Sequence, residues 1–140
     1  MVISIGCDHS ALELKNEVIN HLKARGFEVI DEGTFTKESC DYTDYGYKVA
    51  KDVQQGKAER GIVICFTGIG MSIAANRFKE IRAAHCTDTY SARMTRMHND
   101  SNVLCLGERV TGVGLAKEIV DTWLNTNFEG GRHKKRIDMI

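Results

Sequence analysis

Strand-like and helix-like segments alternate five times along this chain, and this alternation constrains the fold more than any other feature. Short apolar segments predict strands at residues 2–6, 27–31, 61–65, 81–85 and 102–106. Amphipathic segments predict helices at residues 10–25, 42–55, 68–78, 89–97 and 114–125. Because near-continuous apolar strands are buried on both faces, the pattern predicts an α/β fold with a five-stranded parallel sheet between helices.

The length and the charge balance narrow the class of protein. A chain of 140 residues predicts one domain over 1–140, ending in a basic tail over residues 128–140. The 19 basic residues balance the 19 acidic ones, which disfavours nucleic-acid binding. No apolar run approaches the length of a membrane span, so we expect no membrane partner. The five cysteines form no CxxC motif, which argues against a disulfide framework or a zinc site and suits a reducing cytoplasm.

Chemically active side chains follow several of the predicted strands. In an open parallel sheet, ligands bind beyond the carboxyl ends of the strands. Asp8 and His9 follow the first strand, Cys65 ends the third, His85 ends the fourth and Arg109 follows the fifth. The sequence therefore predicts a binding site at this edge.

The segment Thr67-Gly68-Ile69-Gly70 joins the third strand to the next predicted helix. Small residues at the start of a helix let a phosphate or a developing oxyanion approach unpaired N–H groups. The segment lacks the GK[ST] ending of a Walker loop and also lacks GxGxxG. A tight turn that binds nothing remains the alternative for this segment.

Cys65 directly precedes that turn. A thiol near a helix N-terminus loses its proton more readily, so Cys65 is a candidate base or nucleophile. The alternative is a buried cysteine that acts as a small apolar residue. We expect Cys7, Cys86 and Cys105 to be inert packing residues and Cys40 to be exposed.

The other candidates lie far from this edge or near the end of the chain. We expect His98 in a loop between a helix and a strand, at the opposite end of the sheet, where it could serve the site only from a neighbouring subunit. Arg132 and Arg136 are four residues apart and would share a face of a helical turn, as a phosphate clamp requires. The alternative for this basic tail is a solvated end.

Several long motifs occur in a characteristic order. They are GCDHSALELK at 6–15, DYTDYGYKVA at 41–50, RGIVICFTGIGMSIAAN at 60–76, IRAAHCTDTYSARMTRMHNDSNVLCLGERV at 81–110 and FEGGRHKKRI at 128–137. With them, the whole chain resembles the type B ribose-5-phosphate isomerase family, which includes bacterial galactose-6-phosphate and allose-6-phosphate isomerases. The resemblance implies a three-layer α/β/α Rossmann-like sandwich that forms a homodimer or a dimer of dimers.

The resemblance also implies a reaction and its residues. The family interconverts aldose and ketose phosphates through a cis-enediol, with no metal and no cofactor. It implies that Cys65 moves a proton between C2 and C1, that Thr67 assists, and that His98 opens the sugar ring from the partner subunit. The implied substrate-binding residues are Asp8, His9, Tyr42, Phe66, Gly68, Ile69, Gly70, Asn99, Arg109, Arg132 and Arg136.

One departure bears on the substrate. Phe66 stands where the family usually has the glycine of CGTG. The preferred reaction is interconversion of ribose 5-phosphate and ribulose 5-phosphate. The alternatives are an isomerase of a six-carbon phosphate, such as allose 6-phosphate or galactose 6-phosphate, and a non-catalytic sugar-phosphate-binding subunit. The presence of both Cys65 and His98 counts against the non-catalytic alternative.

Overall fold

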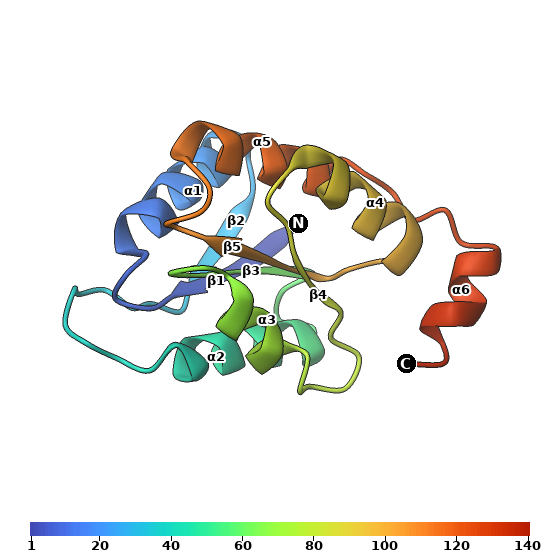
Figure 1. Ribbon diagram of the computed structural model, residues 1–140, viewed down its shortest axis with the longest axis horizontal. Coiled ribbons are helices and arrows are strands. Elements are labelled where there is room, and N and C mark those ends of the chain that lie inside the picture. The colour runs from blue at the N-terminus through green and yellow to red at the C-terminus, as the bar shows by residue number, and fades with distance from the viewer.

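The computed structural model describes residues 1–140 and contains one parallel sheet between two layers of helices (Figure 1). The five strands lie in the order β2-β1-β3-β5-β4. The strands are β1 (Val2–Cys7), β2 (Glu28–Asp31), β3 (Arg60–Cys65), β4 (Ala83–His85) and β5 (Val103–Gly107). The helices are α1 (Leu12–Ala24), α2 (Tyr42–Gln54), α3 (Ile69–Ala75), α4 (Thr89–Asn99), α5 (Val113–Leu124) and α6 (Arg132–Ile137). The predicted α/β/α architecture is confirmed.

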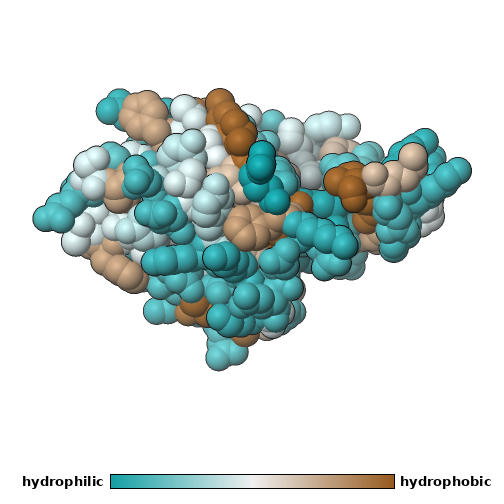
Figure 2. All heavy atoms as spheres, turned by 90° about the horizontal axis from the view of Figure 1, so that it is seen from below, coloured by the Kyte–Doolittle hydropathy of each residue, from teal (hydrophilic) through white to brown (hydrophobic).

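The two faces of the sheet are covered by different helices. Helices α1, α4 and α5 cover one face, and α2 and α3 cover the other (Figure 1). The first face holds the larger apolar core, which includes the fully buried Trp123. The Trp123 Nε1–H donates to the Ser101 hydroxyl at 2.9 Å, so this buried indole keeps a hydrogen-bond partner. The outer surface of α2 and α3 mixes hydrophilic residues with separate apolar spots (Figure 2).

The strand order places a crevice between β1 and β3. From β1 the chain passes through α1 to β2 on one side, and it then returns through α2 to β3 on the other side. Helices α1 and α3, which follow β1 and β3, lie on opposite faces of the sheet (Figure 1). The place where the strand order reverses direction in this way is called a switch point. Ligands bind at the switch point of open α/β sheets. Cys7 pairs in register with Ile64, so Asp8 and Cys65 lie together at this crevice.

The helix after Cys65 and the strand that follows it are both shorter than predicted, and a side-chain amide links them. Helix α3 ends at Ala75 instead of residue 78, and β4 begins at Ala83 instead of residue 81. The Asn76 side chain accepts a hydrogen bond from the N–H of Ala83 at 2.8 Å and donates to its carbonyl at 2.9 Å. This amide joins the end of α3 to the start of β4.

Helix α4 is longer than predicted, and this corrects the position of His98. The helix continues to Asn99, so His98 lies in its last turn and not in a loop. Asp100 ends the helix in the left-handed conformation, with φ of 45°. The tail also forms α6, on which Arg132 and Arg136 are exposed. None of the helices has the combination of length and apolar character that a membrane crossing needs.

Candidate active site

Cys65 ends β3 and faces the turn that begins α3. The residue is 5% exposed, and its Sγ accepts a hydrogen bond from the N–H of Gly68 at 3.2 Å. Gly68 has φ of 86°, a left-handed conformation that strains any residue with a Cβ. The Thr67 hydroxyl accepts the N–H of Ile69 at 3.2 Å, whereas the N–H of Gly70 has no partner in the chain. The turn therefore holds the thiol and leaves one amide donor of the same segment without a partner.

The end of β5 fixes this turn from one side. The N–H of Glu108 donates to the Cys65 carbonyl at 2.9 Å, and the N–H of Arg109 donates to the Phe66 carbonyl at 3.0 Å. A Cβ on Gly107 would lie 2.3 Å from the Thr67 carbonyl oxygen, so only glycine lets the two segments meet. This close approach was not evident from the sequence, where Gly107 is one of 13 glycines.

His85 supports the same turn from β4. A Cβ on Gly68 would lie 2.8 Å from its ring, and the buried Nε2 of His85 has no hydrogen-bond partner. The imidazole ring therefore packs directly against Gly68 and leaves no room for a side chain there. The sequence places His85 at this edge, but it does not show that the ring lies under Gly68.

The other buried cysteines are poor candidates for a base. Burial raises the pKa of the Cys7 thiol to about 12 and that of Cys86 to about 11. Burial also raises the pKa of Cys105 well above its ordinary value. These thiols stay protonated near neutral pH, in agreement with their predicted packing role.

Asp8 and His9 follow β1 at the switch point. Asp8 accepts hydrogen bonds from the N–H and the hydroxyl of Ser10, at 3.0 and 2.6 Å, so its carboxylate is fixed. His9 Nδ1 accepts the N–H of Cys40 at 3.2 Å, which leaves Nε2 to carry the proton of a neutral ring. Cys40 is half-buried through this contact, so the prediction of an exposed residue was wrong.

Two aromatic side chains lie beside the turn. A Cβ on Gly70 would lie 2.8 Å from the Tyr42 ring, so this ring packs directly on the turn. The Arg109 guanidinium lies 5.0 Å from the centre of the Phe66 ring, within cation–π range. Arg109 is exposed and Phe66 is 49% exposed, so both are available to a ligand or a second subunit.

The remaining predicted residues lie at the other end of the sheet. Cys65 pairs in register with Gly107 at the end of β5, whereas His98 and Asn99 precede the start of that strand. The strand separates the two ends by roughly 13 Å, at ~3.3 Å per residue. None of the four hollows on the chain surface has Cys65 in its lining. A single chain therefore does not bring His98 to the thiol.

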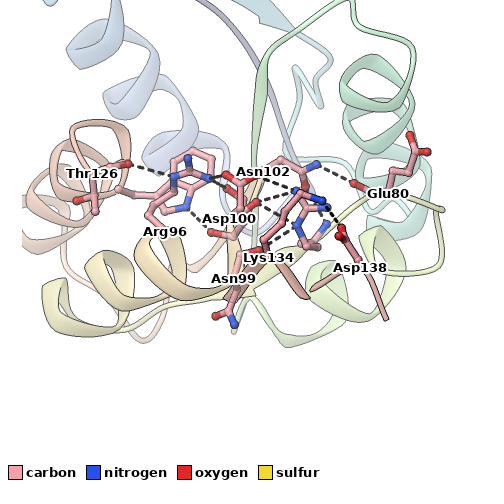
Figure 3. Close-up of polar contacts among 11 residues, drawn as sticks. Glu80, Arg96, Asn99, Asp100, Asn102, Thr126, Lys134 and Asp138 are labelled. Atoms are coloured by element: carbon pink, nitrogen blue, oxygen red, sulfur yellow. Dashed lines mark hydrogen bonds and ion pairs between the residues drawn. The ribbon is translucent and has the colours of Figure 1, made fainter. Parts of the chain in front are cut away.

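A polar network holds the end of α4 in one position (Figure 3). Arg96 contacts Asp100 at 2.9 Å, and the Arg82 Nε–H donates to the Asn99 carbonyl at 2.9 Å. Arg96 also donates to the carbonyls of Ser101 and Thr126. His98 therefore lies on a rigid support, although it is far from Cys65 of its own chain.

The fold also brings together a cluster that the sequence did not show. His98 stacks on His133 of α6, with ring centroids 4.3 Å apart and an angle of 17° between the planes. Glu129 lies beside them, with its Oε2 3.2 Å from His133 Nε2. The sequence has no zinc-type spacing, but these three potential ligands meet through the packing of α6 on α4.

The fold, with the Cys65 turn at the carboxyl ends of its strands, is that of the α/β class of proteins, which bind small molecules at this edge of the sheet. The chain belongs to the Ribose/Galactose Isomerase family, whose family model matches residues 3–140.

Individual relatives match nearly the whole chain. The "Ribose-5-phosphate isomerase B" of Escherichia coli K12 is 52% identical over 99% of this chain and 93% of its own length. The solved Ribose-5-Phosphate Isomerase B of Clostridium thermocellum is 57% identical, with a TM-score of 0.98 over 99% of this chain and 94% of that one. The "D-erythrulose-4-phosphate isomerase" of Pectobacterium atrosepticum is 45% identical over 99% of this chain and 91% of its own length.

Proposed function

We propose that this chain interconverts ribose 5-phosphate and ribulose 5-phosphate by aldose–ketose isomerisation. The observation that carries the proposal is the Cys65 thiol, whose Sγ lies 3.2 Å from the Gly68 amide at a switch-point crevice. The match to relatives named ribose-5-phosphate isomerase B, at 52% and 57% identity, supports the same reaction.

Removal of the proton next to a carbonyl needs a base and a donor for the developing oxyanion. The Cys65 thiolate takes the proton from C2 of the open-chain aldose, and the C1 carbonyl oxygen becomes an enediolate oxygen. In this proposal the N–H of Gly70, which has no partner in the chain, donates to this oxygen, and Thr67 assists with its hydroxyl. Transfer of the O2 proton to O1 and return of the abstracted proton to C1 give the ketose.

Substrate orientation comes from groups around the thiol. We assign Asp8 and Tyr42 to the sugar hydroxyls, because both flank the Cys65 turn. His9 presents its Nε2–H, and Arg109 presents a guanidinium, as donors to a phosphate. The backbone from Phe66 through Gly68 and Ile69 to Gly70 forms the floor beneath the reacting carbons.

The rest of the site comes from a second copy of the chain in this proposal. Ring opening needs an acid, and His98 with its neighbour Asn99 lies at the wrong end of its own sheet. Arg132 and Arg136 share the exposed face of α6 near that same end and would complete the phosphate clamp. Apolar side chains near the Cys65 turn are exposed and suit a covered surface: Phe66, Ile69 and Ile73. A homodimer with two composite sites satisfies these positions.

The main alternative is a sugar phosphate with a different number of carbon atoms. A relative that matches 99% of this chain bears the name of a four-carbon phosphate isomerase, so the family fold serves sugars of different length. We propose the five-carbon substrate because the other two relatives reported above carry its name. The deciding experiment is an isomerase assay with four-, five- and six-carbon aldose phosphates. A kcat/KM that is highest for ribose 5-phosphate supports the proposal, and turnover of none of them overturns it.

A further inference from the structure

We propose that His98, Glu129 and His133 form a binding site for a divalent transition metal such as Zn²⁺, and that the metal inhibits the enzyme by occupying His98. One imidazole comes from α4, one comes from α6, and the carboxylate lies just before α6. Their potential ligand atoms all lie within 4.8 Å of one another. Imidazole nitrogen and carboxylate oxygen are common zinc ligands, and three of them leave a coordination position open.

The buried partner is His133, which is 8% exposed. Its Nε2 makes no hydrogen bond, and the nearest charged group is the Glu129 carboxylate, whose Oε2 lies 3.2 Å away. A buried polar nitrogen without a hydrogen bond is costly, and a bound metal would satisfy it. His133 therefore points to a ligand independently of the clustering itself.

The backbone holds the three groups in place. The N–H of Glu129 donates to the Met97 carbonyl at 3.1 Å, which fixes the carboxylate beside the last turn of α4. Glu129 precedes α6, and the two glycines that follow it, Gly130 and Gly131, turn the chain so that its carboxylate lies 3.2 Å from the His133 ring. Because the lone pairs of an imidazole lie in its ring plane, the exposed edge of the stack has to open by rotation of His98 before both rings reach one ion.

The charges around the cluster permit a cation. Arg132, Lys134, Lys135 and Arg136 are exposed on α6, and Lys134 is paired with Asp138. Glu129 and the two imidazoles thus form the inner surface, while the basic groups extend into solvent. The inhibition rests on the proposed role of His98 in ring opening, but the metal binding does not.

The test is direct metal binding by the metal-stripped full chain. Zn²⁺ is titrated in competition with a chromophoric chelator, and Co²⁺ spectra report the ligand type. We expect one strong site, no thiolate charge-transfer band, and affinity lower by on the order of tenfold or more in Glu129→Gln and His133→Gln. Cys65→Ser should bind as the wild type does, as should His21→Gln, whose imidazole lies outside the cluster.

Glu129 is exposed, so Glu129→Gln tests the site even if the buried His133→Gln fails to fold. Equal affinity in wild type and Glu129→Gln overturns the proposal, as does a thiolate band that disappears in Cys65→Ser. In the assay, Zn²⁺ should inhibit the wild type and inhibit Glu129→Gln at least tenfold less strongly. Binding without isomerase activity on any sugar phosphate would sink the proposed function and leave the metal site intact. Isomerase activity without metal binding that depends on this cluster would overturn the metal site and leave the proposed function intact.

Discussion

The Sγ of Cys65 accepts a hydrogen bond from the amide of Gly68 at 3.2 Å, so the last residue of β3 is tied to the first turn of α3. This hydrogen bond fixes the sulfur atom relative to the turn. The same turn leaves the Gly70 amide without a partner. One short segment thus supplies both the proposed base and a donor for the oxyanion.

Replacement of Cys65 tests the proposed base. Cys65→Ala should fold and bind substrate but lose ~10²–10⁴-fold in kcat, the usual contribution of general-base catalysis. Cys86→Ala is the matched control, since burial raises the pKa of that thiol to about 11 and keeps it out of proton transfer. Steady-state kinetics and circular dichroism measure both variants. Near-normal turnover in Cys65→Ala would remove it from the mechanism.

The close approach of Gly107 to Thr67 predicts a sensitive position. In Gly107→Ala the new Cβ would lie 2.3 Å from the Thr67 carbonyl, so the turn must shift, and both activity and Tm should fall. We expect a stability loss of ~1–3 kcal/mol, typical of overpacking. Gly114→Ala is the control. Gly114 lies in α5, a Cβ added there has no neighbouring atom within 4 Å, and alanine favours a helix. Equal behaviour of the two variants in thermal unfolding and assay would contradict this account.

The buried thiol of Cys7 predicts a loss of stability at alkaline pH. Burial raises its pKa from 9.0 to about 12 in the folded chain, so only the unfolded chain loses this proton as pH rises through 9. The unfolded state then binds fewer protons, and the free energy of unfolding falls between about pH 9 and about pH 12.

Urea unfolding from about pH 8 to about pH 11 measures the effect, and Cys7→Ala should show a shallower decline than the wild type. Val18→Ala removes a buried group that carries no titrating proton, so it should lower stability equally at every pH. A decline in Cys7→Ala as steep as that of the wild type would show that this thiol does not contribute.

The contact between Phe66 and Arg109 predicts an effect on substrate binding. The ring holds the guanidinium at 5.0 Å, so Phe66→Leu should free Arg109 and raise KM for the sugar phosphate with little change in kcat. An exposed cation–π contact contributes about 0.5–1 kcal/mol, which corresponds to a two- to fivefold change in KM. The double variant Phe66→Leu with Arg109→Ala should show no further loss from the leucine. Additive effects on KM would contradict the coupling.

Subunit mixing tests the proposed composite site. Cys65→Ala and His98→Ala homodimers should each be inactive, whereas a mixed dimer holds one site with both changes and one with neither. By symmetry, the mixed dimer should recover up to about half of the wild-type activity. Native mass spectrometry checks that subunits exchange. Exchange without recovery would place His98 outside the neighbour's site.

The sequence by itself determined the alternation of elements and the edge at which chemistry collects. Apolar runs and amphipathic segments specify local conformation through periodicity, so β3 and the turn after Cys65 could be predicted from neighbouring residues alone. The motifs around Cys65 also predicted the isomerase family, which the family match confirms.

Only the tertiary structure decided which distant residues meet. The strand order places Asp8 beside Cys65, and the packing of β5 requires glycine at position 107; neither follows from local pattern. The end of α4 at Asn99 depends on Asp100, whose carboxylate is held by Arg96 of α4 itself and by Arg82, which directly precedes β4. His98 and His133 lie 35 positions apart and meet because α6 packs on α4. Such contacts depend on the whole fold and not on neighbours in sequence, so a local pattern does not predict them.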